Sequence, residues 1–245
     1  MTNLPRFGAE RAMRRIGTEA LASYMTEDWV AANLRESARE DDDGLTCQKW
    51  LIGTPAKRFA FAALYGDLIH AGGRRVLDVG GGLSSLTRLL AERNAYELCD
   101  LLVHDEGARV ERFLAGAPPF RLIARDWHQF STTGPYDVVI ASDLFPNVDQ
   151  RIELFLDWTL RLSREVRLSL TIYNQPRFYL TKRLEADEIL CMLAWNGRQT
   201  RGALQRFVDR IVEPTLELLE DDNDSVYPNG RQVWLVTLRG DVSGD

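Results

Sequence analysis

The chain has 245 residues, with 30 Lys and Arg against 36 Asp and Glu, which gives a formal net charge of −6. This balance argues against bulk electrostatic binding of nucleic acid or of an anionic membrane surface. The three cysteines lie far apart without a C-x-x-C pair, which argues against a disulfide framework and against a zinc site. No segment approaches the roughly 20 apolar residues of a membrane-spanning helix. We therefore expect a cytoplasmic protein with one large α/β domain and a small appendage.

The N-terminal segment predicts a helical appendage. Apolar residues recur at helical spacing from Glu10 to about Arg39, with breaks near Gly17 and Thr26, which indicates two short helices. The acidic turn at 40–44 follows and marks the expected boundary. We therefore divide the chain into a helical appendage, residues 1–44, and the main domain, residues 45–245.

Residues 75–91 predict a buried strand, a glycine turn and the start of a helix. Val76, Leu77 and Val79 form a short apolar strand around Asp78, and three consecutive glycines follow it at positions 80–82. Ser84 or Ser85 is the expected N-cap of the helix. Three residues without a Cβ indicate that another group lies close to this turn.

Further strands and helices alternate after this turn. Helices are expected over 57–65 before the turn and over 108–114 and 152–162 after it, and strands are expected over 98–104, 120–124, 136–141 and 166–172. This alternation predicts a parallel, doubly wound sheet. An acid follows the expected end of three strands, at Asp105, Asp126 and Asp143, on the sheet edge where such folds bind ligands.

The pattern is less regular in the C-terminal third. A basic and aromatic connector at 175–183 precedes an expected helix over 186–195 and a second helix that ends near Val212. Segments 215–219 and 232–239 are expected to form two closing strands. The turn Pro228-Asn229-Gly230 lies between them.

Two ligands fit a glycine turn of this kind. A dinucleotide fingerprint requires G-x-G-x-x-G, whereas here Ser85 replaces the last glycine, and the Asp78 carboxylate would repel a pyrophosphate. The same carboxylate suits a ligand that carries an ammonium and a sulfonium group. The motif Asp78-Val79-Gly80-Gly81-Gly82-Leu83-Ser84 resembles the first motif of class I S-adenosylmethionine-dependent methyltransferases, with Ser84 in place of the third glycine.

This resemblance implies a Rossmann-like sheet of seven strands, mostly parallel with the last strand antiparallel. It also implies that S-adenosylmethionine is the cofactor and that S-adenosylhomocysteine is its product. Asp78 and the 80–82 backbone would contact the methionine part, and Asp105 would accept hydrogen bonds from both ribose hydroxyls. Asp126 would accept from the adenine amino group with Trp127 against the ring, and Asp143 would lie near the methyl group. The implied cofactor site is Asp78, Gly80, Gly81, Gly82, Ser84, Asp105, Asp126, Trp127 and Asp143.

The acceptor determines what further chemistry is required. A hydroxyl acceptor needs a general base, for which His128 and Asp143 are the candidates. The expected substrate contacts are Tyr173, Asn174, Arg177 and Lys182, with the basic groups binding an anionic small molecule. Asp143 and Asn174 are too few ligands for a metal, so no metal is expected. The Asn/Asp-Pro-Pro-Tyr motif of family members that methylate nucleobases or glutamine amides is absent.

The expected function is therefore an S-adenosylmethionine-dependent methyltransferase. Its expected partner is a small-molecule acceptor, with a hydroxyl of a sugar or polysaccharide precursor as the group that is methylated. Two alternatives remain open at this stage. One is a protein or RNA methyltransferase, and the other is a non-catalytic module that binds adenosyl ligands with a degenerate methyltransferase fold.

Overall fold

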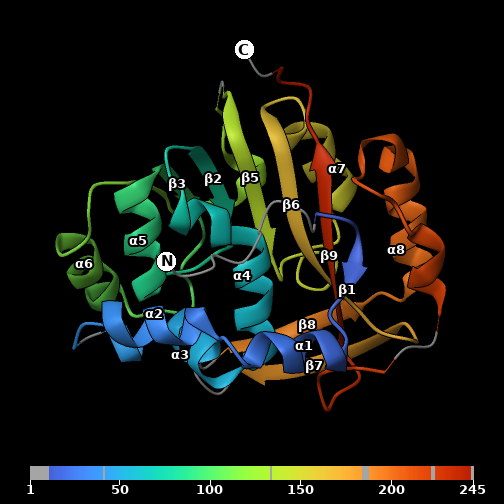
Figure 1. Ribbon diagram of the computed structural model, residues 1–245, viewed down its shortest axis with the longest axis horizontal. Helices are drawn as coiled ribbons and strands as arrows, with labels where there is room; N and C mark the ends of the chain where they lie inside the picture. The colour runs from blue at the N-terminus through green and yellow to red at the C-terminus, as the bar shows by residue number, and fades with distance from the viewer. Residues whose placement is uncertain (1–10, 41, 133, 184–187, 222–223, 244–245) are drawn as a thin grey trace.

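The computed structural model describes residues 11–40, 42–132, 134–183, 188–221 and 224–243. A seven-stranded sheet with the order β1-β9-β6-β5-β2-β3-β4 forms its centre, and β7 and β8 form a separate hairpin (Figure 1). The strands of the large sheet are β1 (Arg14–Arg15), β2 (Arg75–Val79), β3 (Ala95–Cys99), β4 (Arg121–Ile123), β5 (Tyr136–Ser142), β6 (Ser163–Ile172) and β9 (Gln232–Arg239). The hairpin strands are β7 (Arg177–Arg183) and β8 (Glu188–Ala194).

The sheet is mostly parallel, as predicted. Strand β2 pairs in parallel with both β3 and β5, so that Asp78 lies opposite Leu98 on one side and Ile140 on the other. Strand β9 runs antiparallel to β6. The short strand β1, which the sequence did not predict, pairs antiparallel with β9 and occupies the edge of the sheet.

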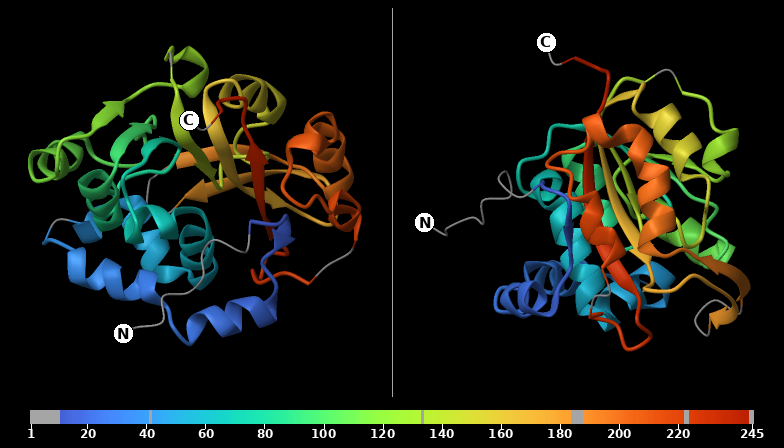
Figure 2. Two further views of the ribbon diagram at one scale, coloured as in Figure 1. Left: turned by 45° about the horizontal axis from the view of Figure 1, so that its top comes forward. Right: turned by 90° about the vertical axis from the view of Figure 1, so that its right-hand side faces the viewer.

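Helices cover both faces of the sheet (Figure 2). The α-helices are α1 (Thr18–Met25), α2 (Trp29–Ser37), α3 (Thr46–Gly53), α4 (Pro55–His70), α5 (Ser85–Arg93), α6 (Gly107–Ala115), α7 (Ile152–Thr159) and α8 (Gly197–Leu204). Short 3-10 helices are η1 (Asp42–Gly44), η2 (Trp127–Gln129), η3 (Gln205–Arg210) and η4 (Leu216–Glu220). No helix among the described residues is both long and apolar enough to cross a membrane.

Two hydrophobic cores lie on opposite faces of the sheet because strand side chains alternate in direction. Val76, Val138 and Ile140 face the core formed with α4, α5 and α6. Leu77, Val79 and Val139 face the core formed with α7, α8 and the 3-10 helices. Asp78 shares the face of Val76, which directs its side chain toward α4.

The N-terminal helices α1 and α2 are confirmed, and helix α3 was not predicted. Asp42 and Arg88 form a buried ion pair in which the two guanidinium nitrogens lie 2.5 and 2.7 Å from the carboxylate oxygens. This pair attaches η1 to α5. The predicted boundary at residue 44 stays a prediction, and residues 1–10 and Asp41 of the proposed appendage lie outside the described residues.

Four predictions of secondary structure are wrong, including the connector expected over 175–183, most of which is strand β7. The first concerns the strand expected over 98–104, which is β3 and ends at Cys99. Its neighbours β2 and β4 end at Val79 and Ile123, opposite Cys99, and leave no partner for further pairing. The apolar residues Leu101 and Val103, which extended the predicted strand, are 55% and 61% exposed.

The helix expected over 186–195 is instead strand β8, although residues 186–187 lie outside the described residues. Burial alternates along this strand with a period of two: Ile189 and Leu193 are exposed, while Met192 and Ala194 are buried. The strand expected over 215–219 is η4. Leu216 and Leu219 enter the core from one side of this 3-10 turn, in which residues three apart are aligned.

Candidate active site

A cavity of about 850 Å³ lies at the carboxyl ends of the parallel strands. Helices α1–α3 and the β7–β8 hairpin lie beneath these strand ends (Figure 1). The volume is in the upper part of the range of roughly 300–1,000 Å³ for ligand pockets. Ten of the predicted residues line this cavity: Asp78, Gly80, Gly81, Gly82, Ser84, Asp105, Asp126, Trp127, Asp143 and Tyr173.

Asp78 is buried beneath the glycine turn. Its carboxylate accepts hydrogen bonds from the hydroxyls of Tyr65, at 3.0 Å, and Tyr96, at 2.7 Å. Burial raises the pKa of Asp78 to about 7, although the two tyrosine hydroxyls act in the opposite direction. A Cβ at Gly81 would lie 2.3 Å from this carboxylate, so only glycine fits there.

Helix α3 packs against the same turn. Gly82 has a positive φ of 66°, and a Cβ there would lie 2.9 Å from the Cβ of Cys47. Ser84 is the N-cap of α5, as predicted. The backbone N–H of Ser84 donates a hydrogen bond to the Thr87 hydroxyl at 3.0 Å. Gln48 Oε1 accepts from the Ser85 N–H at 3.0 Å. The turn and the start of α5 are therefore fixed by contacts on both sides.

Asp100 directly follows β3 and also lines the cavity. Its carboxylate accepts from the backbone N–H of Gly82 at 2.9 Å and of Leu102 at 2.7 Å. Burial raises the pKa of Asp100 above its ordinary value. The predicted ligand contact Asp105 lies farther along the loop and accepts from the Thr46 N–H at 2.8 Å, at the start of α3. Sequence reasoning missed Asp100 because it lies inside the overextended apolar segment.

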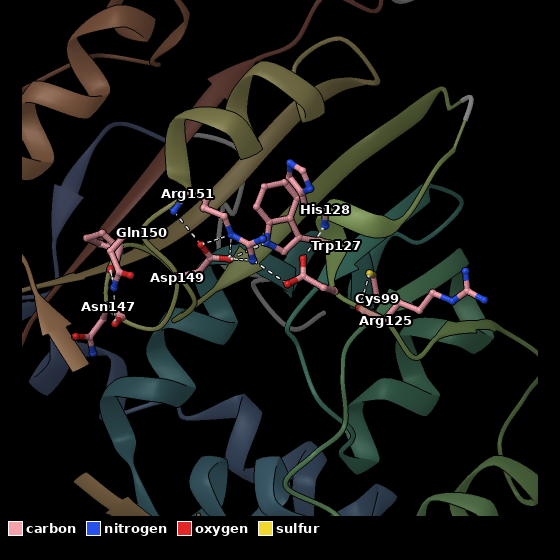
Figure 3. A network of polar contacts seen from close by, with 10 residues as sticks. Cys99, Arg125, Trp127, His128, Asn147, Asp149, Gln150 and Arg151 are labelled. Atoms are coloured by element: carbon pink, nitrogen blue, oxygen red, sulfur yellow. Dashed lines mark hydrogen bonds and ion pairs between the residues drawn. The ribbon is translucent and has the colours of Figure 1, made fainter. Parts of the chain in front are cut away.

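Asp126 and Trp127 belong to a network around Arg151 (Figure 3). Arg151 Nη2 lies 2.9 Å from Asp126 and 2.6 Å from Asp149, and the indole N–H of Trp127 donates to Asp149 at 2.9 Å. These contacts lower the pKa of Asp126, against the opposing effect of burial. Asp149 and Arg151 were not predicted.

The Trp127 ring packs mainly in the protein core. It stacks on Trp158 with ring centroids 5.8 Å apart and is only 5% exposed. The predicted catalytic residue His128 is exposed, does not line the cavity, and places its ring 5.5 Å from that of Trp127. Of the three histidines, which are all described, His104 alone lines the cavity.

Asp143 lies between two cations. Lys57 Nζ is 2.7 Å and Arg231 Nη2 is 3.1 Å from the same carboxylate oxygen, and the Thr171 hydroxyl donates to the other oxygen at 2.6 Å. These partners hold the pKa of Asp143 well below its ordinary value, although burial opposes them. The carboxylate is thus a weak base in this arrangement. Lys57 and Arg231 were not predicted, because they are far from Asp143 in the sequence.

The hairpin brings only part of the predicted substrate site to the cavity. Tyr179, Thr181 and Met192 face the cavity, and the Tyr179 and Tyr173 hydroxyls are 3.0 Å apart. The other predicted contacts, Asn174, Arg177 and Lys182, are not among the residues that line the cavity.

Each of these three residues has a different environment. Asn174 accepts a hydrogen bond from Gln232. The Arg177 guanidinium lies 4.1 Å from the ring centroid of Tyr173 and donates to the carbonyl of Asn229 at 3.1 Å. Lys182 is exposed, on the strand face that Phe178 and Leu180 share. Within the described ranges, no group of three His, Cys, Asp or Glu side chains could hold a metal ion.

Comparisons with known proteins identify the fold. No protein-family model and no curated protein matches the sequence. The structure is similar to the N-methyltransferase NodS from Bradyrhizobium japonicum WM9 in complex with S-adenosyl-L-homocysteine, with a TM-score of 0.50 and 13% identity over 86% of this chain and 97% of that one. It is also similar to a DhpI complex with the same ligand, with a TM-score of 0.51 and 14% identity over 91% of this chain and 98% of that one.

These likenesses confirm the fold that the sequence predicted. The chain has the fold of class I S-adenosylmethionine-dependent methyltransferases. Since both neighbours are far below 25% identity, the comparison extends to the fold alone.

Proposed function

We propose that the chain is an S-adenosylmethionine-dependent methyltransferase that acts on a small molecule. The observation that carries the proposal is one cavity in which a glycine turn, Asp78 and Asp100 meet at the carboxyl ends of adjacent strands. This end of the cavity is acidic, as a ligand with an ammonium group, a sulfonium group and ribose hydroxyls requires. The two structural neighbours named above hold S-adenosylhomocysteine.

The cofactor contacts in this proposal largely follow the sequence prediction. Asp78 and the backbone of Gly80, Gly81 and Gly82 contact the methionine part, while Ser84 fixes the start of α5. Asp126 accepts from the adenine amino group, and Trp127 supports that end of the cavity.

The ribose contact is the exception, and we assign it to Asp100 instead of Asp105. Asp100 follows β3 directly and is bonded to Gly82 in the glycine turn, whereas Asp105 holds the start of α3. Asp100→Asn should weaken binding of S-adenosylhomocysteine at least tenfold in calorimetry, because an amide cannot accept at both of its atoms. Asp105→Asn serves as the matched variant. Equal weakening by the two substitutions, or a larger effect at Asp105, would reject this assignment.

Methyl transfer needs alignment more than covalent catalysis. The acceptor atom forms a bond to the methyl carbon while the carbon–sulfur bond breaks, and the bonding electron pair remains on sulfur. Enclosure of the reactants and exclusion of water supply much of the rate in such a displacement. Helices α3 and α4 and the hairpin would provide this enclosure, because Trp50, Lys57 and Tyr179 all line the cavity.

For the acceptor we propose a hydroxyl of a sugar or polysaccharide precursor. The rings of Trp50, Tyr173 and Tyr179 offer flat apolar faces, and the tyrosine hydroxyls offer hydrogen-bond partners next to them. His104 is the candidate base on the cavity wall. In this proposal Asp143 orients Lys57 and Arg231, and His128 lies beside the adenine end.

A second candidate function is a non-catalytic module that binds adenosyl ligands. The pairing of Asp143 with two cations favours it, because this carboxylate is a weak base. Incubation with labelled S-adenosylmethionine and extracted small molecules separates the two candidates. Label transfer to a small molecule supports the enzyme, whereas binding without transfer supports the module.

We also propose that the protein is cytoplasmic. Cys47, Cys99 and Cys191 are free thiols, as is typical of a reducing compartment.

A further inference from the structure

Two residues that line the cavity each have a buried polar atom without a hydrogen-bond partner in the described structure: Asn147 Oδ1 and Arg231 Nε. Asn147 is 4% exposed, and the side chain of Arg231 is 16% exposed. Both residues line the cavity that holds the proposed cofactor site. A buried polar atom without a partner loses the hydrogen bonds that it would make in water, so such atoms commonly mark the place of a ligand group or an ordered water.

The two atoms belong to one continuous wall. The side chain of Asn147 interacts with Tyr179, whose hydroxyl lies 3.0 Å from that of Tyr173. Tyr173 in turn interacts electrostatically with Arg231. The Arg231 guanidinium lies 4.4 Å from the ring centroid of Tyr227. Aromatic residues therefore separate a hydrogen-bond acceptor from a hydrogen-bond donor.

The charge of this region is positive. Lys57 and Arg231 share the single carboxylate of Asp143, which leaves one positive charge without an anionic partner within this triad. The acidic residues Asp78, Asp100 and Asp105 surround the glycine turn and the start of α3, with Asp100 bonded to Gly82 and Asp105 to Thr46. The cavity thus combines acidic residues around the glycine turn, which suit the proposed cofactor, with a basic and aromatic wall around Asp143, which suits an acceptor.

We propose that the acceptor is a small molecule with an anionic oxygen group, a carboxylate or a phosphate, that binds Arg231 and Lys57 and donates an O–H or N–H to Asn147 Oδ1. This inference rests on the proposed function and narrows its substrate class. It also replaces the sequence prediction that Arg177 and Lys182 bind the anion, because neither residue lines the cavity.

The test measures ligand binding by calorimetry on the full chain saturated with S-adenosylhomocysteine. The probes are 4-hydroxybenzoate and 4-hydroxyphenyl phosphate, with phenol lacking the anion and benzoate lacking the hydroxyl donor. We expect at least one hydroxylated anion to bind tenfold or more tightly than phenol and than benzoate. The tighter of the two anions identifies the group as a carboxylate or a phosphate.

Substitutions of Arg231 and Asn147 test whether these two residues cause the tighter binding of the hydroxylated anions. In Arg231→Gln, the hydroxylated anion should bind no more tightly than phenol. In Arg231→Lys, part of the difference in affinity should return because the positive charge is restored. Asn147→Leu, which has a similar volume, should abolish the preference over benzoate alone. Arg206→Gln, which removes a guanidinium from the surface, should leave both preferences unchanged.

Two results would overturn the inference: phenol binding as tightly as the hydroxylated anions, or preferences that persist in Arg231→Gln and Asn147→Leu. Failure of the proposed function is distinguishable, because S-adenosylhomocysteine itself would then not bind the wild-type protein. If it binds and the anion preference is absent, the proposed function stands and only the substrate class is wrong.

Discussion

At the scale of single residues, Asp78 couples folding to pH. Its pKa is about 7 in the folded protein, against an ordinary value of 3.8. Between these values the folded protein holds a proton that the unfolded chain releases, so this group makes the free energy of unfolding fall as pH rises from about 4 to about 7. Below pH 4 both states are protonated, and above pH 7 both are ionised.

We therefore expect Asp78→Asn to remove part of this pH dependence. The free energy of unfolding of the wild type, minus that of the variant, should decrease between pH 4.5 and pH 7.5, at most by roughly 1.4 kcal/mol per unit of pKa difference. Urea unfolding at a series of pH values measures this difference. Parallel pH profiles for the two proteins would show that the Asp78 carboxyl is ionised throughout this range.

The glycine turn gives a second prediction at this scale. Gly81→Ala places a methyl group against the Asp78 carboxylate, so it should lower the free energy of unfolding by roughly 1–3 kcal/mol and weaken binding of S-adenosylhomocysteine. Gly202→Ala is the matched control, because nothing lies within 4 Å of the added Cβ in α8. It should stabilise the protein slightly. Similar unfolding midpoints for the two variants would contradict the close contact at Gly81.

The sequence revealed the part of the site that is local in the chain. Asp78, the glycines and Ser84 occupy one continuous segment, so their arrangement followed from a strand, a turn and a helix. Lys57 and Arg231 contact Asp143 only in the tertiary structure, and no local sequence pattern predicts these contacts. Asp100 was missed for a different reason, because exposed Leu101 and Val103 imitate the continuation of a strand.

At the scale of elements, the hairpin shows where periodicity fails. Strand β8 is rich in Leu, Ile and Met, and its exposed side is as apolar as the side that faces the cavity, so alternation was not visible in the sequence. The parallel strands of the large sheet were easier to predict. Most of them are short apolar segments followed by an acid or a small residue, and most of their ends were correct to within a few positions.

The attachment of η1 to α5 gives the prediction at this scale. Asp42→Ala would leave the Arg88 guanidinium buried without its carboxylate, which should lower the free energy of unfolding by roughly 3–5 kcal/mol. Adding Arg88→Met should recover part of this loss, since the isolated charge is removed. Urea unfolding of the single and double variants measures both effects.

The exposed pair Arg206 and Glu153 provides the control for that prediction. Its side chains are 57% and 43% exposed, so solvent screens their interaction, and Glu153→Ala should cause no measurable change. If Asp42→Ala is equally harmless, the buried pair does not attach η1 to α5.

At the scale of the whole molecule, the fold and the cavity lead to the same interpretation. The parallel strands, the antiparallel last strand and the acidic residues at the strand ends were expected from a single motif and the alternation that follows it, whereas the edge strand β1 was not. The basic and aromatic wall of the cavity around Asp143 was not predicted, because its cations are Lys57 and Arg231. It is assembled from the consecutive helices α3 and α4, from β7 and from the segment before β9, and these three regions are distant in the sequence.

Calorimetric titration of the folded protein with S-adenosylmethionine, S-adenosylhomocysteine and NAD tests the central claim most directly. We predict that both adenosyl ligands bind at one site per chain and that NAD does not compete with them. Asp100→Asn should weaken the binding of both adenosyl ligands. Absence of binding by either adenosyl ligand to well-folded protein, or preferential binding of NAD, would contradict the account.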